Sequence, residues 1–268
     1  MVQIKIGTAG WDYKDWIGSF YPKRLKRFQF LEFFSKFFEI VEINSSFYNL
    51  PSKEMVKNWN ERVPENFRFI VKVWQNISHN LNDPDLNSYI SEFLHRFKPL
   101  NEKISGFLIQ FPPWFKYSKA HLLKLTSLLK YFPLKYKLII ELRDNSWFKL
   151  EILSKFIDSE QKILGTTYMP NVLPYYMPDQ NFYYIRLIGD RELTIFNRVQ
   201  RDQKEALEDL DRNIQNLIKY AKIYEIFIIV NNHFQGMAPE SVNELKRKWG
   251  LPYRIFNKQK TLVDFFEQ

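Results

Sequence analysis

Polar side chains stand at the ends of several short apolar runs, where they alternate with apolar residues. In the run 40–44, Glu42 and Asn44 alternate with valine and isoleucine, and in the run 137–143 Glu141 and Arg143 alternate with leucine and isoleucine. Successive side chains of a strand point to opposite faces, so each polar pair shares one face. The same rule places four further polar residues at the ends of other runs: Lys72, Gln110, Arg186 and Asn231.

These residue types define the chemistry that such a group could perform. Glu42 and Glu141 are candidates for a general acid and a general base, if their surroundings separate their pKa values. A glycosidase would also need a defined distance between the two carboxylates. Three basic residues (Lys72, Arg143 and Arg186) suit a carboxylate or phosphate, and the amide side chains suit hydroxyl or amide groups. We expect a small anionic or polyhydroxylated ligand, such as a sugar phosphate or a nucleotide.

Aromatic residues follow three of the same runs and add a possible stacking surface. Trp11 follows the first run, Tyr48 the second and Trp147 the fifth. Aromatic faces stack on sugars and bases, so we predict that all three contact the ligand, with Trp11 and Trp147 stacking on it. Packing within the loops is the alternative reading, because 18% of the residues are aromatic.

The elements that must position these residues form an alternating pattern of strands and helices. Eight strand-like runs are separated by longer helical stretches, which indicates an α/β protein and, by the number of strands, a single (β/α)₈ TIM-type barrel. In such a barrel the ligand site lies at the C-terminal ends of the strands. The expected strands are 4–8, 40–44, 67–73, 106–111, 137–143, 162–167, 183–188 and 226–231.

Helical patterns fill most of the gaps, and Ser52 and Ser118 are predicted N-caps. Residues 169–180 hold three prolines and are too short for an ordinary helix, so the crossover between strands six and seven is expected to be irregular. No linker or repeat divides the chain, which predicts one domain over residues 1–268; a doubly wound sheet is the structural alternative. The expected helices are 29–38, 53–61, 85–100, 120–131, 150–159, 201–221 and 239–249.

Several function classes lack support. The absence of cysteine excludes disulfides, thiolate zinc sites and cysteine nucleophiles. The four histidines show no HxH or HExxH spacing, so we predict no metal site, although His79 and His233 follow strands three and eight. No GxGxxG, GxxxxGK[ST] or GxSxG pattern occurs, and no cofactor is predicted.

The net charge of +9 would attract nucleic acid or phosphorylated ligands, but a lysine-rich genome composition explains the same charge. No apolar run is long enough to span a membrane, and the first residues lack the features of a signal peptide. We therefore expect a cytoplasmic protein without membrane contact. The sequence does not define its oligomeric state.

Five segments carry a resemblance to a known family. They read GTAGWDYKDWIGSFYP (7–22), VEINSSFYNLPS (41–52), FRFIVKV (67–73), LIQFPPWF (108–115) and IELRDNSWF (140–148). Together with YIRLIGD (184–190) and IVNNHFQGMAP (229–239), they resemble the YecE-like family, known as domain of unknown function 72, over essentially the whole chain.

The resemblance implies a TIM-type barrel with a polar pocket and no established activity. Two departures from the family pattern follow the third strand: Val73, Trp74 and Gln75 replace small and basic residues, and Ser78 precedes His79 in place of a threonine. The motif positions that it implies are Trp11, Glu42, Asn44, Phe47, Tyr48, Lys72, Gln110, Glu141, Arg143, Trp147, Arg186 and Asn231.

Three hypotheses remain open at this stage. The first is an enzyme, or a degenerate enzyme, that binds a small anionic or sugar-like ligand in the pocket. The second is a nucleic-acid binding or nuclease-like protein, with steeply salt-dependent binding that strengthens with strand length. The third is a non-catalytic barrel that acts through a protein partner, which an exposed apolar patch away from the pocket would favour.

Overall fold

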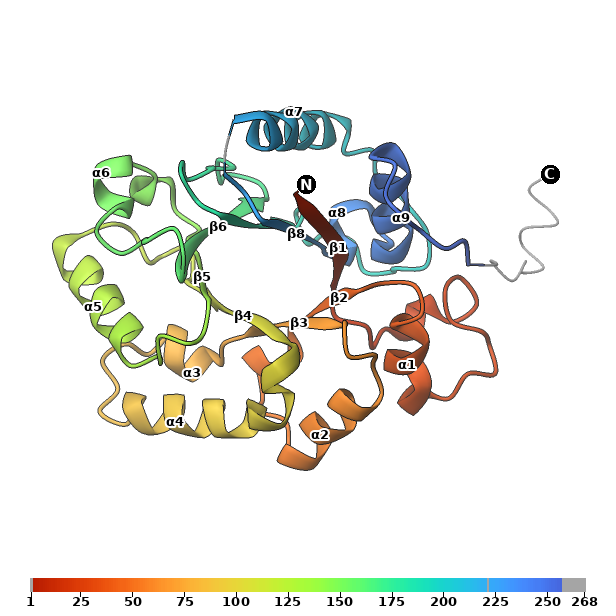
Figure 1. Cartoon of the computed structure of the whole chain (residues 1–268), viewed down its shortest axis with the longest axis horizontal. Coiled ribbons are helices and arrows are strands. Elements are labelled where there is room, and N and C mark those ends of the chain that lie inside the picture. Colours follow the sequence, from red (N-terminus) through yellow and green to blue (C-terminus); the bar gives the residue numbers. More distant parts are fainter. Residues whose placement is uncertain (1, 221, 257–268) are drawn as a thin grey trace.

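Each predicted apolar run forms a strand in the computed structural model, which describes residues 2–220 and 222–256. Consecutive strands pair in parallel, and β1 also pairs with β8, so the sheet closes into a barrel (Figure 1). The predicted (β/α)₈ fold is therefore confirmed. The strands are β1 (Gln3–Ala9), β2 (Ile40–Ile43), β3 (Arg68–Lys72), β4 (Ile104–Gln110), β5 (Leu138–Glu141), β6 (Lys162–Tyr168), β7 (Phe182–Leu187) and β8 (Glu225–Val230).

Helices surround the barrel, as Figure 1 shows, and two predicted caps begin helices as expected. The Ser52 hydroxyl accepts a hydrogen bond from Met55 N at 3.1 Å, and the Ser118 hydroxyl accepts one from His121 N at 3.0 Å. The helices are α1 (Phe30–Phe34), α2 (Lys53–Glu61), α3 (Gln75–Ser78), α4 (Leu86–Phe97), α5 (Lys119–Lys130), α6 (Leu150–Leu153), α7 (Lys204–Tyr220), α8 (Asn232–Gln235) and α9 (Ala238–Lys248).

Two helices are shorter than predicted, and the crossover between β6 and β7 contains no helix. The predicted helix 150–159 ends as the single turn α6, where the Ser154 hydroxyl donates to Leu150 O at 2.7 Å and Asp158 accepts backbone N–H bonds that turn the chain into β6. The helix predicted over 29–38 is only α1. Residues 169–181 form a loop, as predicted; the last residue of the predicted helix 201–221 lies outside the described residues.

The barrel interior is closed by apolar side chains over most of its length. Inward-facing residues of every strand pack into one buried cluster, which fills the barrel as a core. On β2, β3, β4, β5 and β7 the next inward position toward the C-terminal end is polar. This cluster, the apolar inner layer, consists of Ala9, Ile40, Ile70, Leu108, Ile139, Ile163, Phe182, Tyr184, Phe227 and Ile229. A larger cluster packs between the outer face of the strands and the helices.

Candidate functional site

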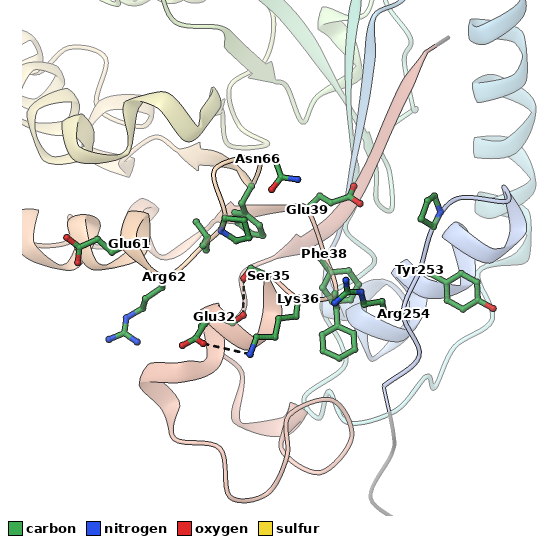
Figure 2. A pocket seen from close by; sticks show the side chains of 15 residues that line it. Glu32, Ser35, Lys36, Phe38, Glu39, Glu61, Arg62, Asn66, Tyr253 and Arg254 are labelled. Atoms are coloured by element: carbon green, nitrogen blue, oxygen red, sulfur yellow. Dashed lines mark hydrogen bonds and ion pairs between the residues drawn. The ribbon is translucent and has the colours of Figure 1, made fainter.

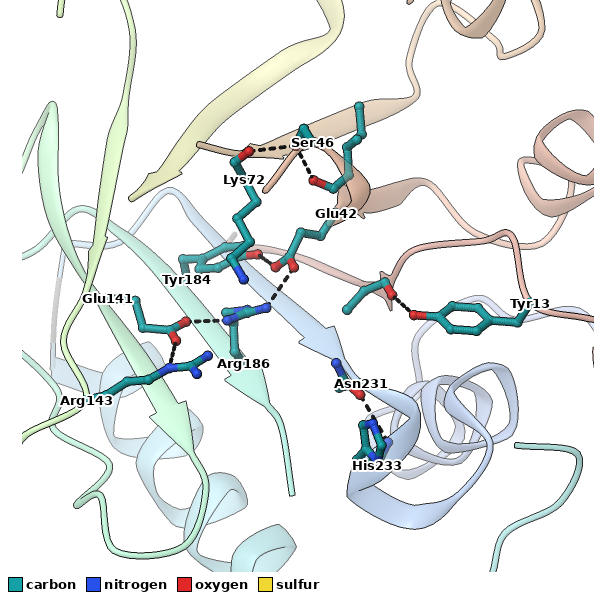
Figure 3. A network of polar contacts seen from close by, with 12 residues as sticks. Tyr13, Glu42, Ser46, Lys72, Glu141, Arg143, Tyr184, Arg186, Asn231 and His233 are labelled. Atoms are coloured by element: carbon teal, nitrogen blue, oxygen red, sulfur yellow. Dashed lines mark hydrogen bonds and ion pairs between the residues drawn. The ribbon is translucent and has the colours of Figure 1, made fainter. Parts of the chain in front are cut away.

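The strand-end residues predicted from alternation lie together at the C-terminal mouth of the barrel. Glu42 follows Ile40 by two positions, and Arg186 follows Tyr184 by two, so each continues the inward face of its strand. We call the charged part of this group the polar ring; it consists of Glu42, Lys72, Glu141, Arg143 and Arg186, all buried. Figure 3 shows these side chains pointing toward one another from β2, β3, β5 and β7.

Arg186 links the two glutamates, which come from strands on different sides of the barrel. Its Nη2 lies 2.7 Å from Glu42 Oε1, and its Nη1 lies 2.5 Å from Glu141 Oε2. All three side chains are at most 2% exposed. A buried arginine with two carboxylates keeps its charge, so the pKa of Arg186 is raised above its usual value despite burial.

The remaining oxygen of each glutamate is also hydrogen-bonded. Arg143 Nε donates to Glu141 Oε1 at 2.7 Å, and the Tyr184 hydroxyl donates to Glu42 Oε2 at 2.5 Å. Burial alone would raise the pKa of Glu141, but the charges of Arg186 and Arg143 outweigh it and lower this pKa to about 2. Glu141 is therefore a permanently ionised carboxylate.

These bonds bear on the predicted acid and base roles of Glu42 and Glu141. A carboxylate must give up one of its bonds to arginine or tyrosine before it can take a proton, which is costly in a buried site. The Arg186 guanidinium also lies between the two carboxylates, where a glycosidase would need to hold the scissile bond. The geometry thus favours orientation of Arg186 as the main task of both glutamates.

Lys72 is the one cation of the polar ring without a carboxylate partner. It is 3% exposed, and its Nζ lies 3.9 Å from the centre of the Phe47 ring. Within the described residues, no hydrogen bond or ion pair reaches this Nζ. Burial, together with the charge of Arg186, lowers the pKa of Lys72 to about 7, although Glu42 and Glu141 partly oppose the shift.

Two residues of the mouth, Tyr184 and Thr167, were not among the residues predicted from the sequence. Tyr184 lies one inward position before Arg186, and Thr167 of β6 pairs in register with Arg186. The same alternation, extended to every inward position of β6 and β7, would have found both. Burial and the charge of Glu42 raise the pKa of Tyr184 well above its usual value, so it remains a proton donor in its bond to Glu42.

The amide residues also lie at strand ends, but part of their hydrogen-bonding capacity is used by the backbone. Gln110 Nε2 donates to Phe111 O at 2.7 Å, and Asn231 Oδ1 accepts from His233 N at 3.1 Å and so caps α8. Asn44 Oδ1 is buried and has no partner. Four such unsatisfied atoms surround the mouth among the described residues: Asn44 Oδ1, Thr167 Oγ1, Arg186 Nε and His233 Nδ1.

Trp147 does not occupy the position that its predicted stacking role requires. Its side chain is 0% exposed, stacks on Phe115 at a ring-centroid distance of 5.4 Å, and donates from Nε1 to Phe115 O at 2.6 Å. It lies on the 3₁₀ turn Asn145–Trp147, outside the strand, so alternation does not govern its direction. Trp147 therefore packs the loop after β5 against Phe115, and neither face of its ring is free for a ligand.

Trp11 and Tyr48 do line a cavity beside the mouth, of about 860 Å³. Asn44 lines the same cavity, as do Trp59 and Arg62 of the α2 region. Trp11 packs edge-on against Trp59 with ring centroids 5.3 Å apart. Aromatic rings next to an amide group suit a sugar or a base. A ligand in this cavity could therefore make the predicted contacts with Trp11, Asn44 and Tyr48.

A second cavity, of about 700 Å³, lies beside the N-terminal ends of β2 and β3 (Figure 2). Glu39 and Phe67, which directly precede β2 and β3, line it together with Lys36 and Arg254. Arg62 borders both cavities. None of the predicted site residues borders the second cavity.

The histidines stay apart from the acidic residues that a metal would need. His79 Nδ1 lies 2.8 Å from the Ser78 hydroxyl, and burial with the nearby Lys72 charge lowers the pKa of His79. No group of three or more histidine, aspartate or glutamate residues in the described ranges has the arrangement of a metal site. None of the described helices has the length and apolar character to cross a bilayer.

The fold and the mouth together define a class: a (β/α)₈ barrel whose strand ends hold a buried polar ring. The chain belongs to the DUF72 family, because the family model described as "protein of unknown function DUF72" matches residues 5–263. The predicted YecE-like resemblance is confirmed.

Two curated relatives, both described as UPF0759 proteins, match different shares of the chain. The UPF0759 protein YunF of Bacillus subtilis is 26% identical, over 93% of this chain and 96% of YunF. The UPF0759 protein YecE of Escherichia coli K12 is 30% identical, over 54% of this chain and 50% of YecE. Among solved structures, a DUF72 protein of Thermotoga maritima superposes with a TM-score of 0.75 at 25% identity, over 92% of this chain and 99% of that one. One from Enterococcus faecalis shares the fold, with a TM-score of 0.74 at 24% identity, over 94% and 99%.

Proposed function

We propose that this protein is an enzyme that binds a small anionic, hydroxyl-bearing molecule at the barrel mouth, of the size of a sugar phosphate or a nucleotide. The observation that carries the proposal is the set of unsatisfied polar atoms around the polar ring. Donors (Arg186 Nε) and acceptors (Asn44 Oδ1) occur together there, and a native protein rarely leaves buried polar atoms without partners unless a ligand or water binds them.

Arg143 is the residue best placed to hold the anionic group. Its Nε is fixed by Glu141, while neither Nη makes a hydrogen bond to any described residue. A guanidinium held on one side presents its remaining donors in a rigid fork, which matches a carboxylate or a phosphate. At 8% exposure it lies at the outer edge of the polar ring.

The aromatic cavity gives the rest of the ligand a place to lie. Trp11 and Tyr48 offer ring faces, and Asn44 joins this cavity to the end of β2, two positions beyond Glu42. A ligand with an anionic group at Arg143 and a sugar or base against Trp11 would use both parts.

Calorimetric titration with a panel of sugar phosphates and nucleotides tests the proposal. We expect saturable binding to the wild type and binding weakened about tenfold to a hundredfold by Arg143→Gln, since a hydrogen bond between charged groups contributes about 1.5–3 kcal/mol. Arg254→Gln is the matched control: it removes the same charge at the second cavity and should leave binding unchanged.

Single-stranded oligonucleotides form the contrasting arm of the titration. Affinity that grows with strand length, falls steeply with salt and survives Arg143→Gln would replace the pocket proposal with nucleic-acid binding. No saturable binding of any small anion would reject the proposal outright.

A further inference from the structure

The charges of the polar ring balance only if Lys72 is neutral. Glu42 and Glu141 supply two negative charges, and Arg143 and Arg186 supply two positive ones. All four carboxylate oxygens are already bound, three by arginine and one by the Tyr184 hydroxyl. A protonated Lys72 would therefore be an unpaired buried cation, which is unfavourable.

The immediate surroundings of the Lys72 amine are apolar on one side and cationic on the other. The Phe47 ring lies against Nζ, and Figure 3 shows the side chain reaching down from β3 toward Arg186. Burial and the charge of Arg186 favour the uncharged amine near neutral pH and lower its pKa to about 7, although the face of the Phe47 ring attracts the ammonium form. An uncharged lysine amine is a nucleophile, whereas an ammonium group is not.

We propose that Lys72 is a catalytic nucleophile that forms an imine with an aldehyde or ketone group of the anionic ligand. This inference rests on the proposed function, because the anion held at Arg143 would bring the carbonyl carbon to the amine. The substrate class narrows accordingly to small carbonyl compounds that carry a carboxylate or a phosphate.

The reaction balances without a further reactant. The nitrogen lone pair forms a bond to the carbonyl carbon while the C=O π electrons move to oxygen. The two amine protons then pass to that oxygen, the C–O bond breaks, and water leaves as the C=N bond forms. No oxidant or reductant takes part.

Imine formation suits this site better than proton abstraction by the same amine. A lysine that acts as a general base becomes an ammonium ion, here beside Arg186 and without a free carboxylate. The neutral imine adds no charge to the balanced ring. The two uses of the amine thus differ in the charge that they leave inside the barrel.

Access to the amine involves the turn after β2. Phe47 on the 3₁₀ turn Ser45–Phe47 covers Nζ, and Ser46 Oγ lies 2.6 Å from Lys72 O. Asn44, Ser45 and Tyr48 of the same segment line the aromatic cavity. A ligand in that cavity lies directly against the turn that covers the amine, and shortening Phe47 should open the way.

Reductive trapping tests the proposal on the wild-type protein. Glyoxylate, a small anionic aldehyde, is incubated with the protein at neutral pH, and sodium borohydride, which reduces neutral imines as well as iminium ions, is added at successive times. Peptide mass spectrometry then measures the modification rate of each lysine. Acetaldehyde serves as the uncharged probe. Lys246 is the internal control, because it is also buried with a lowered pKa but lies on α9, next to Glu39.

We expect Lys72 to react faster than Lys246, because the pKa of Lys72 is lowered to about 7, whereas Glu39, 3.9 Å from Lys246 Nζ, stabilises the ammonium form of Lys246. Arg143→Gln should slow the glyoxylate reaction more than the acetaldehyde reaction, because it removes the anion contact for glyoxylate alone, whereas the loss of its charge raises the pKa of Lys72 for both probes. Phe47→Ala should accelerate both. Lys72→Met should abolish the fast modification.

Failure of this inference is distinguishable from failure of the proposed function. If small anions bind by calorimetry but Lys72 is modified no faster than Lys246, in wild type and in Phe47→Ala alike, the imine is rejected and the binding site stands. If no small anion binds at all, the proposed function fails and the imine proposal falls with it.

Discussion

The two layers of the barrel interior use the same inward positions for opposite purposes. The apolar inner layer fills the barrel interior with side chains such as Leu108 and Ile139, whereas the next inward positions on β4 and β5 are Gln110 and Glu141. The apolar layer stabilises the fold through burial, but the polar ring carries a large desolvation cost that its ion pairs only offset. A protein selected for stability alone would have continued the apolar layer to the mouth, so the polar ring indicates a function.

The largest expected effect comes from removing the central cation of the polar ring. Arg186→Met leaves Glu42 and Glu141 buried without their shared partner and should lower the free energy of unfolding by about 3–5 kcal/mol, measured by urea denaturation. A triple variant, with Glu42→Gln and Glu141→Gln added to Arg186→Met, should be more stable than Arg186→Met alone, because neither buried side chain then carries an unpaired charge. A loss below about 1 kcal/mol in Arg186→Met would contradict the bridging role.

A smaller effect is expected where the ring meets a neutral donor. Tyr184→Phe removes the hydroxyl that donates to Glu42 and leaves one carboxylate oxygen without a partner, which should cost about 1.5–3 kcal/mol of unfolding free energy. Tyr183→Phe is a control on the adjacent position, because its hydroxyl donates only to a neutral backbone oxygen, Met177 O. Equal losses in the two variants would argue against a charged Glu42.

The pH dependence of stability separates Lys72 from the other members of the ring. Its pKa is about 7 in the folded protein against 10.5 ordinarily, so between these values the unfolded chain binds a proton that the folded chain does not. The stability of wild type relative to Lys72→Met should therefore rise with pH from about 7 to 10.5, by at most about 1.4 kcal/mol per pH unit, and be flat below 7. A difference that stays flat from pH 7 to 10.5 would contradict the lowered pKa and show that Lys72 is held as an ammonium ion.

The smallest effect is expected in the apolar inner layer under a mild substitution. Ile229→Val removes one methylene group and should cost about 0.5–1.5 kcal/mol, with small-anion binding unchanged. Gln110→Leu, at an inward position of the polar group, should instead alter binding with little change in stability. If both variants changed the affinity for small anions equally, the apolar inner layer and the polar residues at the mouth would not differ in function.

Alternation along strands was sufficient to predict the positions of Glu42, Lys72 and Arg186, because the direction of a strand side chain follows from the backbone alone. The pairing within the ring was not predictable. Whether Glu42 and Glu141 meet depends on barrel tilt and on the length of Arg186, which spans both.

Where the chain leaves its strands, the sequence offered no comparable rule. Trp147 lies on a short turn whose side chains follow no period, so its burial against Phe115 could not be read from spacing. The helices after β1 and β5 ended early for a related reason: at Ser35 and Ser154, side-chain hydroxyls bond to backbone carbonyls in the last turn. Helix propensity and hydrophobic periodicity do not indicate where a side-chain hydroxyl will bond to the backbone and end a helix.

The bond between Arg186 and Glu42 joins residues 144 positions apart in the chain. During synthesis the ribosome therefore releases β2 and its carboxylate long before the arginine that neutralises it exists, and β1 waits still longer for β8, its second neighbour. Until then Glu42 favours contact with water over burial. The polar ring can therefore be completed only after β7 has been synthesised, and the barrel can close only after β8.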